Sequence, residues 1–228
     1  MIKLFNSLQY KYDTYTIFSD FVELSALSIN SVVEIIKRSE DEKRYKQIQT
    51  KYPNKDFKIF PELFAELVDE LESNCSDVLG ELFMELDLGS SAKGQFFTPY
   101  SLCKATADMV LQDMDKIILE NGYISVNEPC VGGGAMIIAI YEIMRREKFN
   151  PQKQLMVYAQ DLDLKAVYMS YVQLSLLGIP AVIKHMNTLS LEEFNSYQTP
   201  FWILGGWDFR KPKSKYKVNG DGQIGFEV

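Results

Sequence analysis

Apolar residues recur at helical spacing through most of the first 88 residues. From Thr14 to about Tyr45 they follow three- and four-residue steps, which predicts one or two buried helices, and Ser31 is a position where the helix could bend or restart. Residues 40–55 are mostly charged or polar, so they predict an exposed helix end followed by a loop. The chain therefore begins with helices whose apolar faces need a partner.

Two further helices are predicted in this first part of the chain. Pro61 stands where a helix often has proline as its first residue, and an apolar stripe from Leu63 to Leu71 continues that helix. Asp77 is placed to cap the next helix, whose apolar positions run from 78 to 86. Together these segments predict a layer of helices.

After residue 100, short apolar runs alternate with helical segments. The predicted helices cover 102–114, 135–148 and 164–177, and the predicted strands cover 123–127, 156–160 and 181–185. Strands joined by helices of this length imply a parallel sheet with right-handed crossovers, a doubly wound α/β fold. Residues 89–91, Gly-Ser-Ser, predict a flexible joint before this pattern. We therefore divide the chain into an N-terminal helical region, 1–88, and an α/β domain, 89–228.

Composition narrows the classes of protein to consider. With 228 residues, of which 46% are hydrophobic, the chain can bury a sizeable core. Its 3 cysteines form no Cys-x-x-Cys pair, which argues against a disulfide framework and a zinc site, and we predict no metal. No apolar run approaches the ~18 residues of a membrane helix, and the chain does not open with a basic patch and an apolar run. We expect a soluble, cytoplasmic protein that does not enter a membrane.

The charge of the chain bears on its partners. A formal net charge of -7 weighs against a free-standing nucleic-acid-binding protein, because such proteins neutralise phosphates with lysine and arginine. A basic cluster near the C-terminus could still contact DNA, although such runs are more often solvated faces. Its members are Arg210, Lys211, Lys213, Lys215 and Lys217. DNA therefore remains a candidate partner.

A glycine-rich turn follows the first predicted strand. Residues 128–134, Glu-Pro-Cys-Val-Gly-Gly-Gly, let the backbone pass close to a ligand, and the next helix presents its N-terminal amides there. Glu128 would repel a pyrophosphate and attract a positively charged group. A tight strand-to-helix turn without a ligand remains the alternative.

An acidic residue ends the second predicted strand. In doubly wound folds a carboxylate at the position of Asp161 can accept hydrogen bonds from both hydroxyls of a ribose. Asp163 is a second candidate for this role, or the cap of the following helix. The spacing between the glycine-rich turn and Asp161 favours the binding of an adenosyl group.

Three strings in this order resemble a known family. They are Gly94-Gln95-Phe96-Phe97-Thr98-Pro99, Asn127-Glu128-Pro129-Cys130-Val131-Gly132-Gly133-Gly134-Ala135-Met136 and Gln160-Asp161-Leu162-Asp163. Over roughly residues 78–190 they are similar to the cofactor-binding half of the adenine-N6 DNA methyltransferases, particularly the modification subunits of type I restriction systems. The resemblance implies a Rossmann-like core, with a shortened parallel sheet flanked by helices, that binds S-adenosyl-L-methionine.

The resemblance also implies a role for each cofactor-binding residue. Glu128 would attract the ammonium of the methionine part, and Asn187, in a His-Met-Asn-Thr-Leu string, would accept from the adenine amino group. The aromatic residues of the 94–99 string would cover the cofactor, although Phe96 and Phe97 are also plausible core residues. The implied cofactor-binding set is Gln95, Phe96, Phe97, Thr98, Pro99, Glu128, Pro129, Cys130, Gly132, Gly134, Asp161, Leu162 and Asn187.

The catalytic string of that family, Asn/Asp-Pro-Pro-Tyr/Phe, is absent from these 228 residues. Its place could be taken by residues 198–201, Gln-Thr-Pro-Phe, or by residues 205–207, Gly-Gly-Trp, after a fourth strand over 200–204. Spacing favours the second, in which Trp207 would stack on a flipped base. Residues 215–218 and 223–228 predict a terminal hairpin.

Three functions remain open on this basis. The chain is a compact adenine-specific DNA methyltransferase, a catalytically inactive S-adenosylmethionine-binding subunit for regulation or assembly, or a structural interaction module without a ligand. The shortened sheet predicts an exposed edge that a protein partner or a second copy of the chain could complete.

Overall fold

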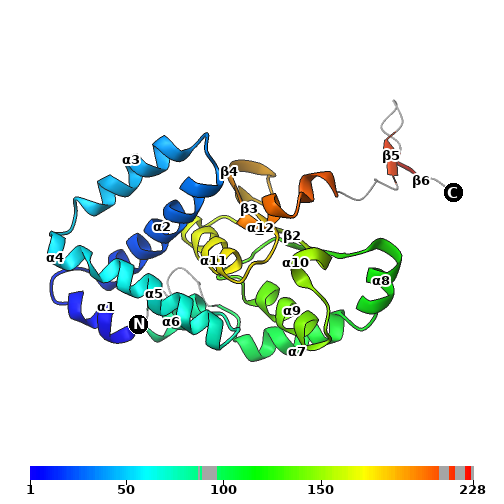
Figure 1. Ribbon diagram of the computed structural model, residues 1–228, viewed down its shortest axis with the longest axis horizontal. Helices are drawn as coiled ribbons and strands as arrows, with labels where there is room; N and C mark the ends of the chain where they lie inside the picture. The colour runs from blue at the N-terminus through cyan, green and yellow to red at the C-terminus, as the bar shows by residue number, and fades with distance from the viewer. Residues whose placement is uncertain (87, 89–96, 211–215, 219–223, 227–228) are drawn as a thin grey trace.

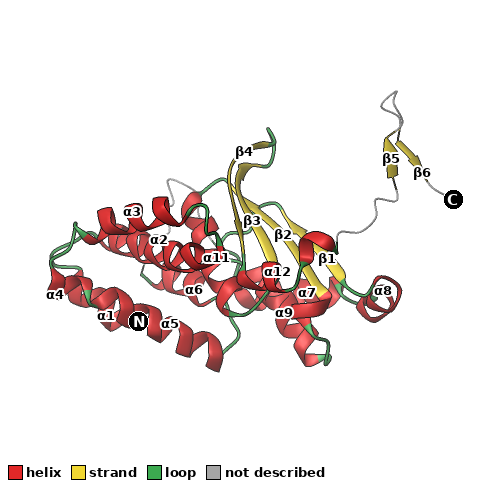
Figure 2. Ribbon diagram, turned by 45° about the horizontal axis from the view of Figure 1, so that its top comes forward, coloured by secondary structure: helices red, strands yellow, loops and turns green. Residues whose placement is uncertain are grey.

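The computed structural model describes residues 1–86, 88, 97–210, 216–218 and 224–226 (Figure 1). It is an α/β protein in which a four-stranded, mostly parallel sheet is flanked by helices (Figure 2). The α/β class predicted from the sequence is confirmed. The predicted joint at 89–91 lies outside the described residues.

The N-terminal part is a layer of helices, as predicted. These are α1 (Ile2–Leu8), α2 (Thr14–Val33), α3 (Arg38–Gln49), α4 (Asn54–Phe57), α5 (Ile59–Ser73) and α6 (Val78–Glu85). The 14–45 segment forms two helices, which separate after Val33 rather than at Ser31. Pro61 is the third residue of α5 instead of the first, still within the turn where the missing amide donor costs nothing. Asp77 caps α6 by accepting from the Gly80 amide, as expected.

The prediction of an exposed helix end followed by a loop within 40–55 is confirmed, since α3 ends at Gln49 and residues 50–53 connect it to α4. Arg44 forms an ion pair with Glu23 of α2 at 2.6 Å, and Ile48 is buried in the core. A single buried apolar position and charged contacts to α2 therefore hold a helix that has no regular apolar stripe.

Helix α2 has the length and composition of a membrane-spanning helix. Its mean hydropathy is 1.2, and 56% of the apolar window lies buried inside the protein. The buried side chains include Phe18, Phe21 and Val22, which belong to the main hydrophobic core. The same composition is expected of a core helix, and α2 packs as one.

The sheet has the order β1-β2-β3-β4, with β1 (Ile124–Glu128), β2 (Leu155–Asp161), β3 (Ala181–Asn187) and β4 (Glu192–Gln198). The first three strands are parallel and confirm the three predicted runs. Around them lie α7 (Tyr100–Val110), α8 (Met114–Asn121), α9 (Ala135–Arg146), α10 (Pro151–Gln154), α11 (Leu164–Leu176), α12 (Pro200–Leu204) and the short 3-10 helix η1 (Trp207–Phe209). The helix predicted over 102–114 ends at Val110, and α8 begins at Met114.

The two faces of the sheet are packed against hydrophobic clusters of different size. Alternate residues such as Val157 and Ile183 belong to the main core, which includes α9, α11 and the N-terminal helices. Their neighbours Met156 and Val182 face the other way and pack with Trp202 and Trp207 in a second, smaller cluster. The main core therefore runs without a break from the N-terminal helices to the sheet.

The fourth strand differs from the prediction. The expected strand over 200–204 is wrong, since Pro200–Leu204 is helix α12. The actual strand, β4, precedes it and runs antiparallel to β3, with Gln198 opposite Val182. Pro200 is accepted because it begins the helix, where its missing amide would have no partner. The predicted terminal hairpin is confirmed as β5 (Tyr216–Val218) paired with β6 (Ile224–Phe226).

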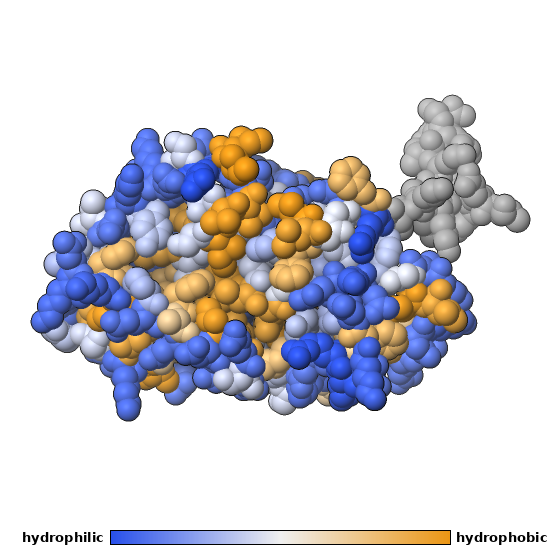
Figure 3. Space-filling model, in the orientation of Figure 1, coloured by the Kyte–Doolittle hydropathy of each residue, from blue (hydrophilic) through white to orange (hydrophobic). Residues whose placement is uncertain are grey.

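Within the described residues, β1 and β4 each pair with one neighbour only and form the two edges of the main sheet. The face of the molecule in Figure 3 carries apolar side chains toward its middle and a mostly hydrophilic rim. Apolar residues at the turn after α2 are well exposed, with Ile35 at 77% and Ile36 at 91%. The expected exposed sheet edge is present; a partner that covers it stays a prediction.

Thr199 locks the end of β4 to the start of β3, and Thr199→Val tests this contact. The fully buried Thr199 hydroxyl accepts from the Ala181 amide at 2.9 Å and donates to the Ile179 carbonyl at 2.7 Å. Valine has the same shape and would leave both backbone groups unpaired, so we expect a loss of about 1–3 kcal/mol in unfolding free energy by urea denaturation.

Thr50→Val is the matched control. The Thr50 hydroxyl bonds only to the Gln47 carbonyl at the exposed end of α3, so its loss should change the unfolding free energy by no more than about 0.5 kcal/mol. Equal effects of the two substitutions would contradict the assigned role of Thr199.

Candidate functional site

The glycine-rich turn between β1 and α9 is held in place by the second strand. The Val131 amide donates to the Gln160 carbonyl at 2.8 Å, and the Gly134 amide donates to the Val131 carbonyl at 2.9 Å. Gly132 has φ +55° and Gly134 has φ +103°, conformations that glycine adopts without strain. The turn therefore has a fixed shape at the carboxyl end of the sheet, where ligands of open α/β sheets bind.

A cavity of about 400 Å³ opens beside this turn. Its lining comes from the turn, from β2, from the start of α11 and from segments that precede β1. The residues are Asp77, Phe97, Thr98, Cys103, Glu128, Cys130, Val131, Gly132, Gly133, Ala135, Met136, Asp161 and Ala166. The volume falls within the range of small-molecule sites, roughly 300–1,000 Å³.

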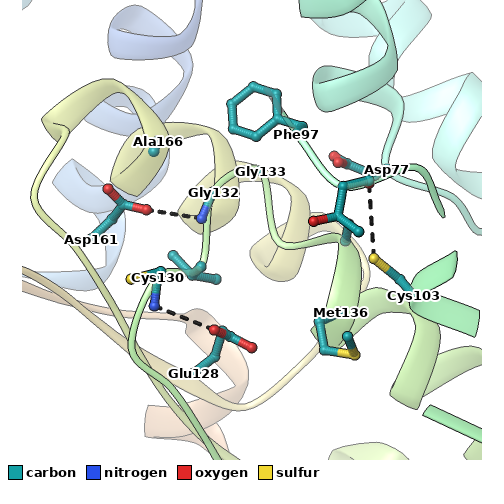
Figure 4. Close-up of a pocket in the computed structure, with 13 residues that line it drawn as sticks. Asp77, Phe97, Cys103, Glu128, Cys130, Gly132, Gly133, Met136, Asp161 and Ala166 are labelled. Atoms are coloured by element: carbon teal, nitrogen blue, oxygen red, sulfur yellow. Dashed lines mark hydrogen bonds between the residues drawn. The ribbon is translucent and has the colours of Figure 1, made fainter. Parts of the chain in front are cut away.

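Three of these lining residues are acidic and none is basic. In Figure 4, Asp161 lies on one side of Gly132, Asp77 lies on the opposite side beyond Gly133, and Glu128 lies below the turn. No group of three or more His, Cys, Asp or Glu among the described residues is arranged to hold a metal ion. The electrostatic field of the cavity therefore favours a ligand with its own positive charge.

Asp161 and Glu128 each bind the backbone nearby. Asp161 Oδ2 accepts from the Gly132 amide and Oδ1 from the Asp163 amide, both at 2.9 Å, so the carboxylate fixes the turn. Glu128 Oε1 accepts from the Cys130 amide at 3.3 Å. The pKa of Glu128 is raised above its ordinary value, mainly by burial and to a smaller extent by the negative charge of Asp161. The hydrogen bond from the Cys130 amide acts in the opposite direction and lowers this pKa. Asp163 caps α11 through the Lys165 amide, one of its two predicted roles.

Asp77 reaches the cavity from the N-terminal helical layer. Its Oδ1 accepts from the Gly80 amide at 2.9 Å and from Gln173 Nε2 at 2.7 Å. The Gln173 amide also donates to the Gly133 carbonyl at 2.7 Å and accepts from the Leu79 amide at 3.0 Å. Gln173, which is fully buried, therefore joins α6, α11 and the glycine-rich turn.

Phe97 covers the turn from above. A side chain on Gly132 would place its Cβ 3.0 Å from the Phe97 ring, so the ring lies directly against the glycine. Phe97 also packs edge-on against Phe83 of α6, with ring centroids 5.1 Å apart. One ring thus contributes both to the core and to the wall of the cavity, and the two alternatives weighed for it are compatible. Gln95 and Phe96 lie outside the described residues.

Some of the predicted cofactor-binding residues line the cavity, and the other described ones lie near it. Phe97, Thr98, Glu128, Cys130, Gly132 and Asp161 line the cavity. Pro99 is the N-cap residue of α7, Gly134 is the N-cap residue of α9, and Leu162 is exposed next to Asp161. Asn187 Oδ1 accepts from the Leu189 and Ser190 amides, and Pro129 is tied to the same corner by the Thr188 hydroxyl at 2.9 Å. The adenine contact of Asn187 stays a prediction.

Trp207 lies at the other end of the sheet. Because β4 runs antiparallel, it carries the chain from the carboxyl end of β3 back to its start, a distance of ~20 Å for a strand of this length. There Trp207 is fully buried, packed edge-on against Tyr123 and alongside Trp202. Residues 198–201 lie at the same end. Neither candidate for the catalytic string is next to the cavity, and the arrangement argues against base stacking by Trp207.

Asp77 and Gln173 are two residues of the site that were not predicted from the sequence. Asp77 was assigned only as a helix cap, and Gln173 lies in the middle of a helix without a motif around it. One signal was present: a Cβ on Gly80 would come within 2.0 Å of an Asp77 oxygen, so the Asp-Val-Leu-Gly spacing lets the carboxylate fold back over its own helix.

Comparison with known proteins identifies the family. A family model described as N-6 DNA Methylase matches residues 77–208, more than half of the chain. The match begins at the capping residue Asp77 and includes the whole cavity lining. No curated protein and no solved structure matches the chain. The chain belongs to the adenine-N6 DNA methyltransferase family.

Proposed function

We propose that this chain binds S-adenosylmethionine in the cavity at the carboxyl ends of β1 and β2, as the methyl-donor-binding part of an adenine-N6 DNA methyltransferase. The observation that carries the proposal is an acidic cavity, with no basic residue among the described residues of its lining, built around a glycine-rich turn that Asp161 fixes. The family uses this cofactor generally, which supports the same conclusion.

The residues present fit the chemical groups of this cofactor. Each oxygen of Asp161 accepts one hydrogen bond from a backbone amide and has a second lone pair that can accept a hydrogen bond from a ribose hydroxyl. Gly132 leaves room for the Phe97 ring, which supplies an apolar wall of the cavity. The acidic lining complements the positive charges of the ammonium and sulfonium groups. When bound, the cofactor would supply an electrophilic methyl group.

Binding without methyl transfer by the chain alone is the second candidate function. It is favoured by the position of residues 198–201 and 205–207, which β4 carries to the end of the sheet opposite the cavity. Gly205 and Gly206 also have no side chain that could accept a hydrogen bond from an adenine amino group. We propose that DNA methylation, the family activity, requires acceptor-side residues from a partner at the open edge of β1.

Asp161→Asn tests the cofactor site by calorimetry with S-adenosylmethionine. The unchanged protein should bind the cofactor, and the variant should bind it about tenfold or more weakly, because hydrogen bonds to a charged acceptor contribute about 1.5–3 kcal/mol. Asparagine keeps one acceptor oxygen for the Gly132 amide, so the variant should stay folded.

Asp115→Asn, an exposed aspartate on α8, is the control and should leave the affinity unchanged. A folded wild-type protein that gives no binding heat would sink the proposed function. Normal binding by Asp161→Asn would remove only the role of Asp161.

A methyl-transfer assay separates the two candidate functions. We expect that the chain alone transfers no labelled methyl group from S-adenosylmethionine to adenine in duplex DNA, because neither candidate catalytic string lies at the cavity. Asp161→Asn measures the background of the assay. Label on adenine that depends on Asp161 would show that the chain alone is a working methyltransferase.

A further inference from the structure

Among the described residues, Asp77 is a buried acid without a basic partner. Its side chain is almost fully buried, with the residue 3% exposed, and its two hydrogen bonds within the described residues come from the uncharged Gly80 amide and Gln173 amide. Burial raises the pKa of this carboxyl group, against the lowering effect of Gln173 and Gly80. A buried carboxylate is costly unless a positive charge compensates it, so the position calls for an explanation.

The position of Asp77 supplies that explanation. The carboxylate lines the cavity, and both of its described hydrogen bonds end on Oδ1. A Cβ on Gly133 would lie 2.7 Å from Oδ1 and 3.0 Å from Oδ2, so the absence of a side chain there lets the carboxylate reach the glycine-rich turn. Figure 4 shows Asp77 across the turn from Asp161.

The three acids of the cavity are not equivalent. Asp161 uses both oxygens to fix backbone amides. Glu128 is half-buried and makes one long bond to the Cys130 amide. Asp77 is the most deeply buried of the three and is held rigidly by Gln173. Because charges attract more strongly where water is excluded, a cation gains most at Asp77.

We propose that Asp77, rather than Glu128, is the main binding residue for the ammonium group of the methyl donor's methionine part. The inference rests on the proposed function, since it presumes that the donor occupies this cavity. It also assigns the N-terminal helical layer a direct part in cofactor binding, because Asp77 enters the site from the start of α6.

Asp77→Asn tests the proposal through the affinities of three ligands measured by calorimetry. Asparagine caps helices as well as aspartate and can still accept from Gly80 and Gln173, so it removes mainly the charge. We expect the affinities for S-adenosylmethionine and S-adenosylhomocysteine, which both carry the ammonium, to fall equally, by about tenfold or more. Binding of 5′-methylthioadenosine, which lacks the amino-acid part, should not change. Glu128→Gln should weaken the first two ligands less.

Asp41→Asn is the matched control. Asp41 is also a buried aspartate that accepts from a side-chain amide, Asn30 Nδ2 at 2.7 Å, and it lies outside the cavity, so all three affinities should stay unchanged. Four results would overturn the proposal: unchanged affinities in Asp77→Asn, a loss that extends to methylthioadenosine, a loss for S-adenosylmethionine alone, or a loss in Glu128→Gln as large as that in Asp77→Asn. If the wild-type protein binds none of the three ligands, the proposed function itself fails.

Discussion

The hydrogen bonds of one buried amide hold the site together. The Gln173 side chain accepts a hydrogen bond from the Leu79 amide at the start of α6. It also donates to the Asp77 carboxylate and to the Gly133 carbonyl of the glycine-rich turn. All three partners are buried, so removal of the Gln173 amide would take a hydrogen bond from each of them and leave the Asp77 carboxylate with the Gly80 amide alone. The glycine-rich turn keeps its shape because α11 carries this residue beneath it.

This constraint makes the N-terminal helices part of the cofactor site rather than an attachment to it. Besides Asp77, the ring of Phe83 packs on Phe97, which in turn lies on Gly132. Lys165 of α11 is buried and donates to the Tyr15 hydroxyl of α2 at 2.8 Å. The division at residue 88 follows a change of pattern along the sequence, whereas the packing on both sides of it forms one core.

The helices and strands that could be predicted from the sequence are those with a regular spacing of apolar residues. Local spacing of apolar residues and glycines predicted the three parallel strands, the helices between them and the glycine-rich turn. The position of Asp161 then follows from the end of the second strand. The start of helix α3 at Arg38 did not follow from an apolar pattern, because its contacts to α2 are charged and lie far apart in sequence. The Pro200–Leu204 run was taken as a strand because a short apolar run has no period that distinguishes a strand from a helix. Asp77 and Gln173 were missed because their partners are up to 96 residues away.

The direction of one strand explains why the donor site and the candidate catalytic strings are separate. A parallel strand would deliver the following residues to the carboxyl edge, beside Glu128 and Asp161; antiparallel β4 delivers them to the amino edge instead. There Trp202 and Trp207 cover Met156 and Val182, which would otherwise be exposed on a bare face of the sheet. Gly205 permits this, because a Cβ at that position would come within 2.5 Å of the Trp207 ring. Residues 200–207 therefore close the second face of the sheet, and any group that accepts a methyl at the cavity has to approach from outside this segment.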